Sequence, residues 1–207
     1  MTLIQTLNEY LSPDERQRAE RFRFPRDRQR FVAGRGWLRT LLARYLNITP
    51  TLVQFEYLSH GKPVLVNDPT IQFNLSHSQD LALCVVTRQH AVGIDVEYLR
   101  PVAANDIAQR FFRPNEWTTL ATLNPEEQQS AFFRYWTCKE AYLKACGDGL
   151  GKLQSVEVSL GNQAQLIWLE NDRGQQWFLQ EFQPAHGYTA ALVVATAQPN
   201  LHFWDAA

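Results

Sequence analysis

The chain has 207 residues, of which 45% are hydrophobic and 12% aromatic, a composition that can fill the core of one compact unit or of two small halves. Its formal net charge of −1 gives no global reason to expect nucleic acid as a partner. No apolar run approaches the ~20 residues that cross a bilayer, the N-terminus lacks the pattern of a signal peptide, and the three cysteines show no paired spacing, so we expect a cytoplasmic protein without a membrane partner.

The first part of the chain reads as helices followed by strands. Ser12-Pro13, followed by two acidic residues, is a helix-start signature and predicts a helix over 13–22. Pro25 ends it, and apolar residues at helical spacing predict a second helix over 27–46. The strands expected after these helices span residues 52–57, 72–75, 81–86 and 91–97.

The second part repeats this order. Three helices are expected over 104–110, 114–122 and 125–146, the last with a proline at its start and Gly147 at its end. The strands expected after them span residues 155–160, 164–169, 176–183 and 189–196. The duplicated order predicts an α+β fold built as a pseudo-twofold pair of similar halves, 1–99 and 100–207, with the active site in the cleft between them.

Positive charge is concentrated in the first helices. Residues 14–39 hold nine arginines against four acidic residues, a local excess of five positive charges. Such a segment indicates either a local anion site or the solvated face of an amphipathic helix, and charge alone leaves both open.

A first candidate site lies on the strand expected over 91–97. Because strand side chains alternate, Asp95 and Glu97 share a face with Gly93. Two carboxylates beside a residue without a side chain can hold a hard cation such as Mg²⁺, which prefers one or two carboxylates together with waters and substrate phosphates. An Asp-x-Glu pattern is also common on solvated strand ends, so the pattern alone does not decide.

A second candidate site lies on the helix expected over 125–146. Trp136, Glu140 and Lys144 are each four residues apart and therefore share one stripe of the helix. Glu140 and Lys144 could form an ordinary surface ion pair, but the bulky Trp136 on the same stripe favours partial burial.

A third candidate site is His77, which is flanked by Ser76 and Ser78 at the end of a predicted strand. This arrangement can bind phosphate, but the motif taken alone favours a structural histidine. The chain shows no nucleophile elbow, no Walker A or dinucleotide glycine pattern, and no zinc ligand set.

Taken together and in this order, the three segments resemble the Sfp-type 4′-phosphopantetheinyl transferases. The motifs of that family are Asn-x-Ser-His-Ser, Gly-Ile-Asp-x-Glu and Trp-x-x-Lys-Glu-x-x-x-Lys, and they match residues 74–78, 93–97 and 136–144. Looser matches are the basic helical segment 18–35 and Gly61-Lys62-Pro63. The resemblance covers roughly residues 12–150, and the last 57 residues carry no recognisable motif.

The resemblance implies a magnesium-dependent transfer of the 4′-phosphopantetheine arm of coenzyme A to a serine hydroxyl of an apo acyl or peptidyl carrier protein, with release of adenosine 3′,5′-bisphosphate. It implies that Asp95, Glu97 and Glu140 hold the metal. The residues implied to bind coenzyme A are Arg18, Arg21, Lys62, Ser76, His77 and Lys144. Of these, Lys62 would border the adenine, and Lys144 would sit on the pyrophosphate. A working monomer is expected, because the pseudo-dimer would supply both halves from one chain.

The implied catalytic residues are Glu140, Lys144 and Asp95. Our mechanistic hypothesis is that Glu140, directly or through a metal-bound water, accepts the serine proton. Lys144 would stabilise or protonate the leaving group, and Asp95 would act as a metal ligand.

Two other functions fit parts of the pattern. The three carboxylates could serve a metal-dependent phosphodiesterase or nuclease, although such an enzyme would need a basic track with aromatic platforms for nucleic acid. The chain could also be a non-catalytic module that binds coenzyme A or a carrier protein. For the carrier we expect an acidic helix that docks on basic surface, with Phe111, Phe112 and Trp117 as apolar contacts or as core residues.

Overall fold

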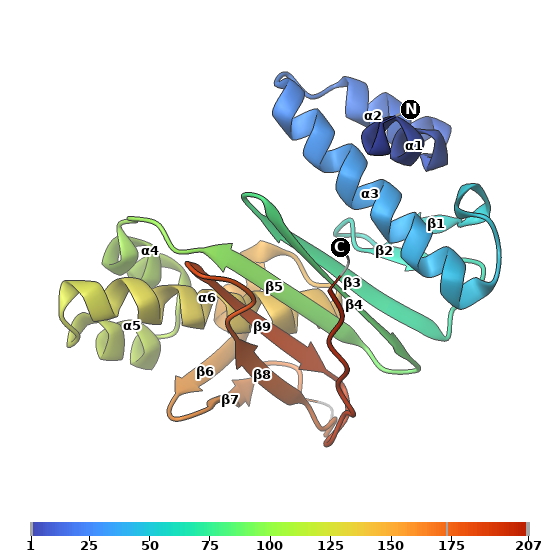
Figure 1. The fold of residues 1–207 in the computed structure, drawn as a ribbon. Coiled ribbons are helices and arrows are strands. Elements are labelled where there is room, and N and C mark those ends of the chain that lie inside the picture. The colour runs from blue at the N-terminus through green and yellow to red at the C-terminus, as the bar shows by residue number, and fades with distance from the viewer. Residues whose placement is uncertain (1, 173, 206–207) are drawn as a thin grey trace. The chain divides into compact units, whose positions relative to one another are not determined.

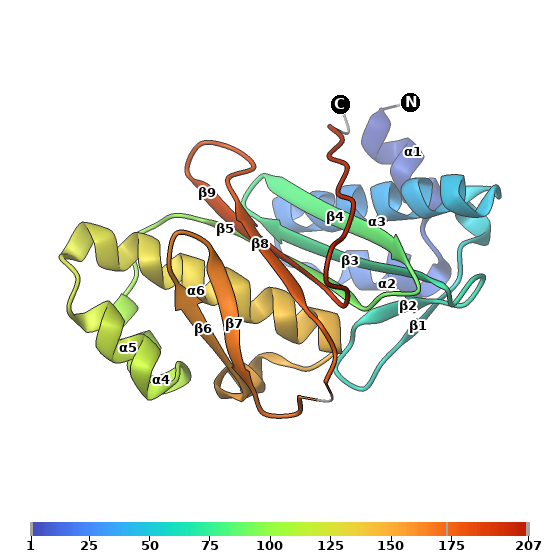
Figure 2. The same cartoon turned by 90° about the horizontal axis from the view of Figure 1, so that it is seen from below.

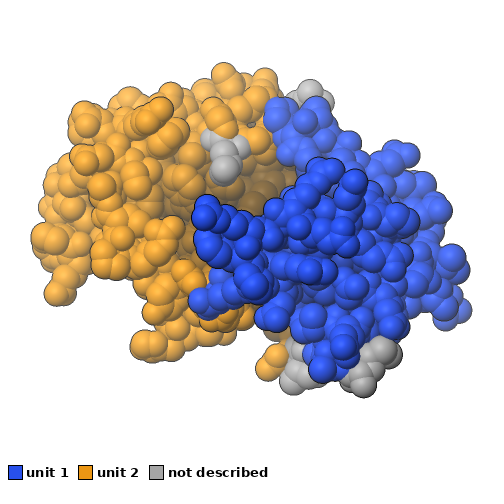
Figure 3. All heavy atoms as spheres, turned by 90° about the horizontal axis from the view of Figure 1, so that it is seen from above, with its two compact units in different colours: residues 1–71 blue, residues 72–207 orange. Residues whose placement is uncertain are grey.

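The computed structural model describes residues 2–172 and 174–205, and their arrangement is drawn in Figure 1. The chain divides into two compact units, one ending at Ile71 and the other beginning at Gln72 (Figure 3). The units part after residue 71, whereas the halves expected from the sequence are 1–99 and 100–207. The reason is that strand β5 (Val92–Tyr98) pairs with β9 (Tyr188–Val194) and packs on helix α6 (Pro125–Cys146), all within the second unit.

Unit 1 consists of helices followed by a small hairpin. Its elements are α1 (Leu3–Tyr10), α2 (Pro13–Glu20), α3 (Pro25–Leu46), the 3-10 turn η1 (Pro50–Leu52), β1 (Phe55–Tyr57) and β2 (Pro63–Leu65). The two strands pair antiparallel. Buried Leu7, Leu11, Ala19 and Val32 join the three helices into one core.

Two features of unit 1 differ from the sequence prediction. Helix α1 was not predicted, although Thr2 caps it: the Thr2 N–H donates to Gln5 Oε1 at 2.7 Å, and the Gln5 N–H donates to Thr2 Oγ1 at 3.3 Å. Helix α3 begins at Pro25 and not at Asp27. Proline suits the first turn of a helix, because an N–H at that position would have no partner within the helix.

Unit 2 is built around one long helix on a sheet. Its elements are the strand pair β3 (Ile71–Ser78) and β4 (Leu81–Arg88), then β5, α4 (Ala104–Phe111), α5 (Pro114–Ala121), α6, the turn η2 (Leu150–Ser155), β6 (Val156–Leu160), β7 (Ala164–Leu169), β8 (Phe178–Phe182) and β9. The strands β5, β9 and β8 form one antiparallel sheet, and β6 and β7 form another.

Helix α6 lies across β5 and β9, as Figures 1 and 2 show. The contact is closely packed because small and aliphatic side chains, including Ala141, Leu143, Ala191 and Val193, are almost fully buried in it. The buried face of α6 therefore fixes which of its side chains point toward β5.

The order of elements is duplicated along the chain. Helices α1, α2 and α3 have 8, 8 and 22 residues, and so do α4, α5 and α6; each set leads into a 3-10 turn and a two-stranded hairpin. This confirms the α+β class and the repeated pattern of helices followed by strands. Within the described residues, no helix is both long and apolar enough to span a bilayer.

Candidate active site

Strand β5 and helix α6 approach each other closely at Gly93. A Cβ atom built on Gly93 would lie 2.0 Å from the Ala141 carbonyl oxygen and 2.4 Å from the Ala145 nitrogen. No residue with a side chain fits there unless the backbone moves. The missing side chain lets the two backbones meet, and this brings Asp95, two residues along β5, next to Lys144 on α6.

Asp95 lies at the centre of a buried polar cluster. Its side chain is 5% exposed, and its Oδ1 accepts hydrogen bonds from Ser76 Oγ at 2.9 Å and from Lys144 Nζ. The Lys144 amino group also donates to Ser76 Oγ at 3.0 Å. The structure thus brings together one residue from each of the three motif segments of the sequence.

The Glu97 carboxylate, like that of Asp95, accepts a hydrogen bond from a serine of β3. Ser78 Oγ donates to Glu97 Oε2 at 2.9 Å and also accepts the Tyr98 N–H at 3.0 Å. Because Glu97 is two residues from Asp95, both carboxylates lie on the same face of β5, as the alternation of strand side chains predicted.

Glu140 is the third acidic residue of the cluster. It is 5% exposed, and its Oε1 atom is buried without a hydrogen-bond partner among the described residues. The same is true of Asp95 Oδ2. Burial, followed by the nearby charge of Asp95, raises the pKa of Glu140 to about 7, although Lys144 opposes the shift.

The cluster carries more negative than positive charge. Burial raises the pKa of Asp95 against the opposing charge of Lys144, and burial also raises the pKa of Glu97, to which Asp95 adds a repulsive contribution. The charges of Asp95 and Glu97 both act on Glu140, so the three carboxylates lie close enough to repel one another. A buried excess of carboxylate charge is costly, and a cation would relieve it.

The donor set fits a hard divalent cation. Asp95 Oδ2 and Glu140 Oε1 are carboxylate oxygens with no other partner among the residues described, and oxygen ligands of this kind suit Mg²⁺. No three His, Cys, Asp or Glu side chains of the described chain are arranged to hold a metal as they stand. Lys144 instead pairs with Asp95.

The next residues predicted to bind coenzyme A are His77, Arg18 and Arg21, and no hydrogen bond or ion pair described above joins them to the carboxylate cluster. His77 is exposed, and strand alternation directs it away from Ser76 and Ser78. Arg18 and Arg21 belong to unit 1, where both are exposed and the Arg18 guanidinium lies 5.3 Å from the centre of the Phe31 ring.

Lys62 lies in the loop between β1 and β2 and is partly buried. Of the three aromatic residues considered for carrier contact, Phe112 is only 1% exposed and belongs to the core of unit 2.

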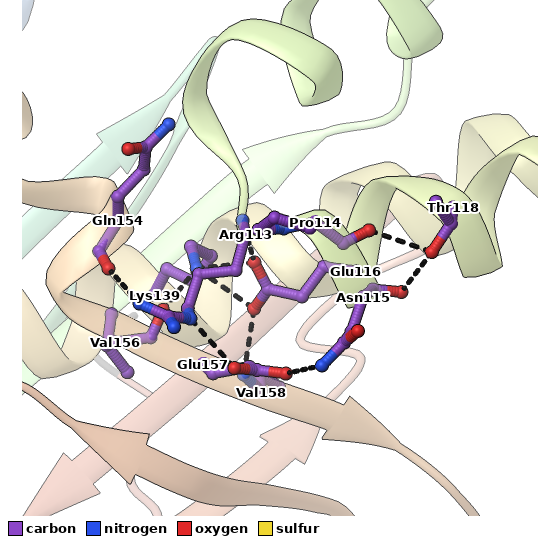
Figure 4. Close-up of polar contacts among 10 residues, drawn as sticks. All are labelled: Arg113, Pro114, Asn115, Glu116, Thr118, Lys139, Gln154, Val156, Glu157 and Val158. Carbon is purple, nitrogen blue, oxygen red and sulfur yellow. Dashed lines mark hydrogen bonds and ion pairs between the residues drawn. The ribbon is translucent and has the colours of Figure 1, made fainter.

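Lys139 is a motif residue to which the sequence assigned no role. Its fully buried amino group donates to both carboxylate oxygens of Glu116, at 2.9 and 2.7 Å, and to the Val156 carbonyl (Figure 4). Glu116 also accepts the N–H groups of Val158 and Arg113, both at 2.8 Å. These contacts join helix α6 to α5 and β6. They hold α6 in the orientation about its own axis that directs Glu140 and Lys144 toward β5.

Three acidic side chains and a lysine, gathered where a strand meets a helix, suit an enzyme that transfers a phosphoryl-type group with the help of a divalent cation. Comparison with known proteins agrees. Residues 91–195 match the 4′-phosphopantetheinyl transferase superfamily, and residues 2–89 match the N-terminal region of a 4′-phosphopantetheinyl transferase family.

Individual relatives match along almost the whole chain. The 4′-phosphopantetheinyl transferase HetI of Nostoc sp. is 46% identical over an alignment of 205 residues, which covers 97% of this chain and 85% of that protein. The 4′-phosphopantetheinyl transferase Sfp of Bacillus subtilis is 29% identical over 187 residues, covering 90% of this chain and 83% of that protein.

A solved holo-(acyl-carrier-protein) synthase of Bacillus anthracis covers 50% of this chain and 93% of its own, with 22% identity and a TM-score of 0.40, a likeness too low to carry an argument. From the family matches and the identity to HetI, the chain belongs to the 4′-phosphopantetheinyl transferase family.

Proposed function

We propose that this protein transfers the 4′-phosphopantetheine arm of coenzyme A to a serine hydroxyl of an apo acyl or peptidyl carrier protein and releases adenosine 3′,5′-bisphosphate. The observation that carries the proposal is the cluster of Asp95, Glu140 and Lys144 at the contact of β5 and α6, in a chain of this family. The residues of that cluster occupy the motif positions at which the family resemblance implies them.

The proposed cation is Mg²⁺, held by Asp95, Glu97 and Glu140. The unpartnered oxygens Asp95 Oδ2 and Glu140 Oε1 support this assignment. When bound, Mg²⁺ supplies positive charge for the pyrophosphate of coenzyme A as the bond to phosphorus breaks. Magnesium commonly takes few protein ligands and completes its shell with waters and substrate phosphates, which is consistent with the small donor set here.

Glu140 is proposed as the group that accepts the proton of the attacking serine, directly or through one water. Burial brings the pKa of Glu140 to about 7 in the metal-free protein. A bound cation would lower this pKa, so Glu140 would be ionised and able to take up a proton at neutral pH. Because Oε1 is proposed as a cation ligand, the serine proton would be taken by the other carboxylate oxygen of Glu140 or by a water.

Lys144 is proposed to stabilise the leaving adenosine 3′,5′-bisphosphate. Its ammonium group lies beside Asp95 and Ser76, at the edge of the carboxylate cluster, with its side chain about a quarter exposed at 27%. A positive charge that reaches both the cluster and solvent is suited to the charge that develops on a departing phosphate.

The remaining proposed contacts to coenzyme A follow from the family resemblance. The residues concerned are Arg18, Arg21, Lys62, Ser76 and His77. Arginine and lysine suit the phosphates of coenzyme A. The Ser76 hydroxyl already bonds Asp95 and Lys144, so we assign any contact of Ser76 with coenzyme A to its backbone. We further propose that the protein acts as a monomer and in the cytoplasm.

The test is a direct transfer assay. The protein is incubated with coenzyme A, Mg²⁺ and apo carrier proteins from several biosynthetic systems, and each carrier is weighed by intact mass spectrometry. The proposal predicts that a carrier gains the mass of one phosphopantetheine group, and that the gain disappears when its acceptor serine is changed to alanine.

Two results would contradict the proposal. Coenzyme A binding without transfer to any carrier would favour a non-catalytic binding module. Hydrolysis of DNA or RNA in Mg²⁺, again without transfer, would favour a metal-dependent nuclease.

A further inference from the structure

Three alternating side chains of β3 form a row along β5. Asn74, Ser76 and Ser78 are two residues apart and therefore share one face of their strand. Each reaches a residue further along β5: Asn74 Oδ1 accepts the Ile94 N–H at 2.8 Å, Ser76 reaches Asp95, and Ser78 reaches Glu97. Among the described strands, β3 and β5 belong to different sheets and are not paired through their backbones. These side chains therefore link the two strands.

The two serines of this row each hold one oxygen of a carboxylate. Ser76 Oγ engages Asp95 Oδ1, and the other oxygen of Asp95, Oδ2, is left without a hydrogen-bond partner among the residues described. Ser78 Oγ engages Glu97 Oε2 and is itself fixed by the Tyr98 N–H. A carboxylate tied through one oxygen cannot rotate freely, so the direction of its second oxygen is also set.

Orientation of this kind matters for a small cation. Mg²⁺ demands near-ideal octahedral geometry with oxygens at about 2.0–2.1 Å. Loss of a group that orients a metal ligand typically weakens metal affinity by ~10–100-fold. The two hydrogen bonds of Ser78 are positioned to supply such orientation to Glu97, which is otherwise the most exposed of the three acids.

We propose that Ser78 is a positioning residue of the cation site, which holds Glu97 in the orientation that divalent-cation binding requires. Ser76 serves Asp95 in the same way, but its hydroxyl also contacts Lys144, so Ser78 isolates the effect more cleanly. This inference rests on the proposed function, because it assigns a residue to the cation that the transfer reaction would use.

A purely structural role for Ser78 predicts something different. If the hydrogen bonds of Ser78 serve only to join β3 to β5, their loss should lower the free energy of unfolding of the metal-free protein by about 1 kcal/mol for a typical hydrogen bond and leave cation affinity unchanged. If Ser78 positions Glu97, cation affinity falls even in protein that remains fully folded.

The experiment is calorimetric titration of MgCl₂ into metal-free protein, with and without coenzyme A, for wild type, Ser78→Ala, Ser78→Thr and Ser159→Ala. Threonine keeps the hydroxyl and suits a strand. Ser159 is an exposed serine on β6, outside the cluster, and serves as the matched control. Circular dichroism and urea unfolding of each variant establish that it is folded.

Ser78→Ala should raise the Mg²⁺ dissociation constant by ~10-fold. Ser78→Thr and Ser159→Ala should stay within about 2-fold of wild type. The Mg²⁺ concentration for half-maximal transfer should rise in parallel for Ser78→Ala, while kcat recovers at saturating Mg²⁺.

A Ser78→Ala protein that binds Mg²⁺ as wild type does overturns this inference and leaves the proposed function standing. A Ser78→Thr protein as weak as Ser78→Ala also overturns it, since the hydroxyl would then not be the relevant group. Wild-type protein that binds no Mg²⁺ overturns both the inference and the proposed cation.

Discussion

Lys139 and Glu116 form a buried ion pair that has a counterpart in the other unit. Lys139 Nζ on α6 donates to both carboxylate oxygens of Glu116 on α5, and both side chains are at most 1% exposed. In unit 1, Arg39 on α3 donates to Glu15 on α2 at 2.6 Å, and both side chains are again buried. Glu116 and Glu15 each stand third in a helix that begins with proline, so the duplication extends from element order to a specific contact.

Removal of one partner from this pair should destabilise unit 2. Lys139→Met leaves the Glu116 carboxylate buried without its cation, a change that typically costs about 3–5 kcal/mol. Unfolding in urea measures the effect. The double variant Glu116→Gln/Lys139→Met is the control, because it removes both charges and should be more stable than Lys139→Met alone. A single variant as stable as wild type would contradict the assigned role.

Gly93→Ala should disrupt the contact of β5 with α6. The added Cβ would lie 2.0 Å from the Ala141 carbonyl oxygen, so the strand and helix must separate. Overpacking of this kind usually costs about 1–3 kcal/mol and occasionally more. We also expect transfer to fall sharply, because Asp95 and Lys144 would no longer meet.

Gly151→Ala is the matched control, since a Cβ at Gly151 meets no atom within 4 Å. Gly151→Ala should keep the wild-type stability and transfer rate. If Gly93→Ala kept both as well, the close approach of β5 and α6 would not be what positions the cluster.

The raised pKa of Glu140 predicts a pH-dependent stability of the metal-free protein. A carboxylate with a pKa of about 7 in the folded state and about 4.5 in the unfolded state binds more protons when folded between those values. Stability is therefore fully present below about pH 4.5 and is lost as the pH rises through about 7, by roughly 3 kcal/mol from this group.

Urea unfolding with a chelator, at several pH values between 4.5 and 8, measures this loss. In Glu140→Gln, the free energy of unfolding should not show the decrease that Glu140 causes between these pH values. Excess Mg²⁺ should restore the stability of the wild type above pH 7. Parallel pH profiles for wild type and Glu140→Gln would show that Glu140 does not titrate in this range.

Lys144→Met should separate cation binding from turnover. In the metal-free protein Lys144 pairs with Asp95, so its removal should leave Mg²⁺ affinity at least as high as in wild type. The rate of transfer should fall by ~10²-fold or more, because the leaving phosphate loses a stabilising charge. Calorimetry and single-turnover kinetics measure the two quantities. Weakened Mg²⁺ binding with an unchanged rate would contradict the proposed division of roles.

Much of the fold was predictable because its signals are local. The proline at the start of α2 and α6, the helical spacing of apolar residues and the glycine after α6 all predicted elements close to those observed. Helix α1 was missed because it is only eight residues long, although the Thr2 and Gln5 capping box and the apolar residues Ile4 and Leu7 carry a helical signal.

The candidate site was predictable in part for a different reason. Alternation on β5 placed Asp95 and Glu97 on one face, and four-residue spacing placed Glu140 and Lys144 on one stripe. The roles of Ser78 and Lys139 depend on partners 19 and 23 residues away in sequence, and only the packing of strand and helix brings those partners together. Ser76 and Ser78 were visible in the sequence, but the segment was interpreted as a phosphate site or a structural histidine and not as a support for carboxylates.

The most direct test of the proposed reaction compares one carrier protein after incubation with coenzyme A and either wild-type protein or Asp95→Asn, each with Mg²⁺ and with a chelator. Intact mass of the carrier is the readout. We expect a gain of one phosphopantetheine group with wild type in Mg²⁺ and no gain in the other three samples. Equal gains in all four samples would show that neither the carboxylate cluster nor a divalent cation carries the reaction.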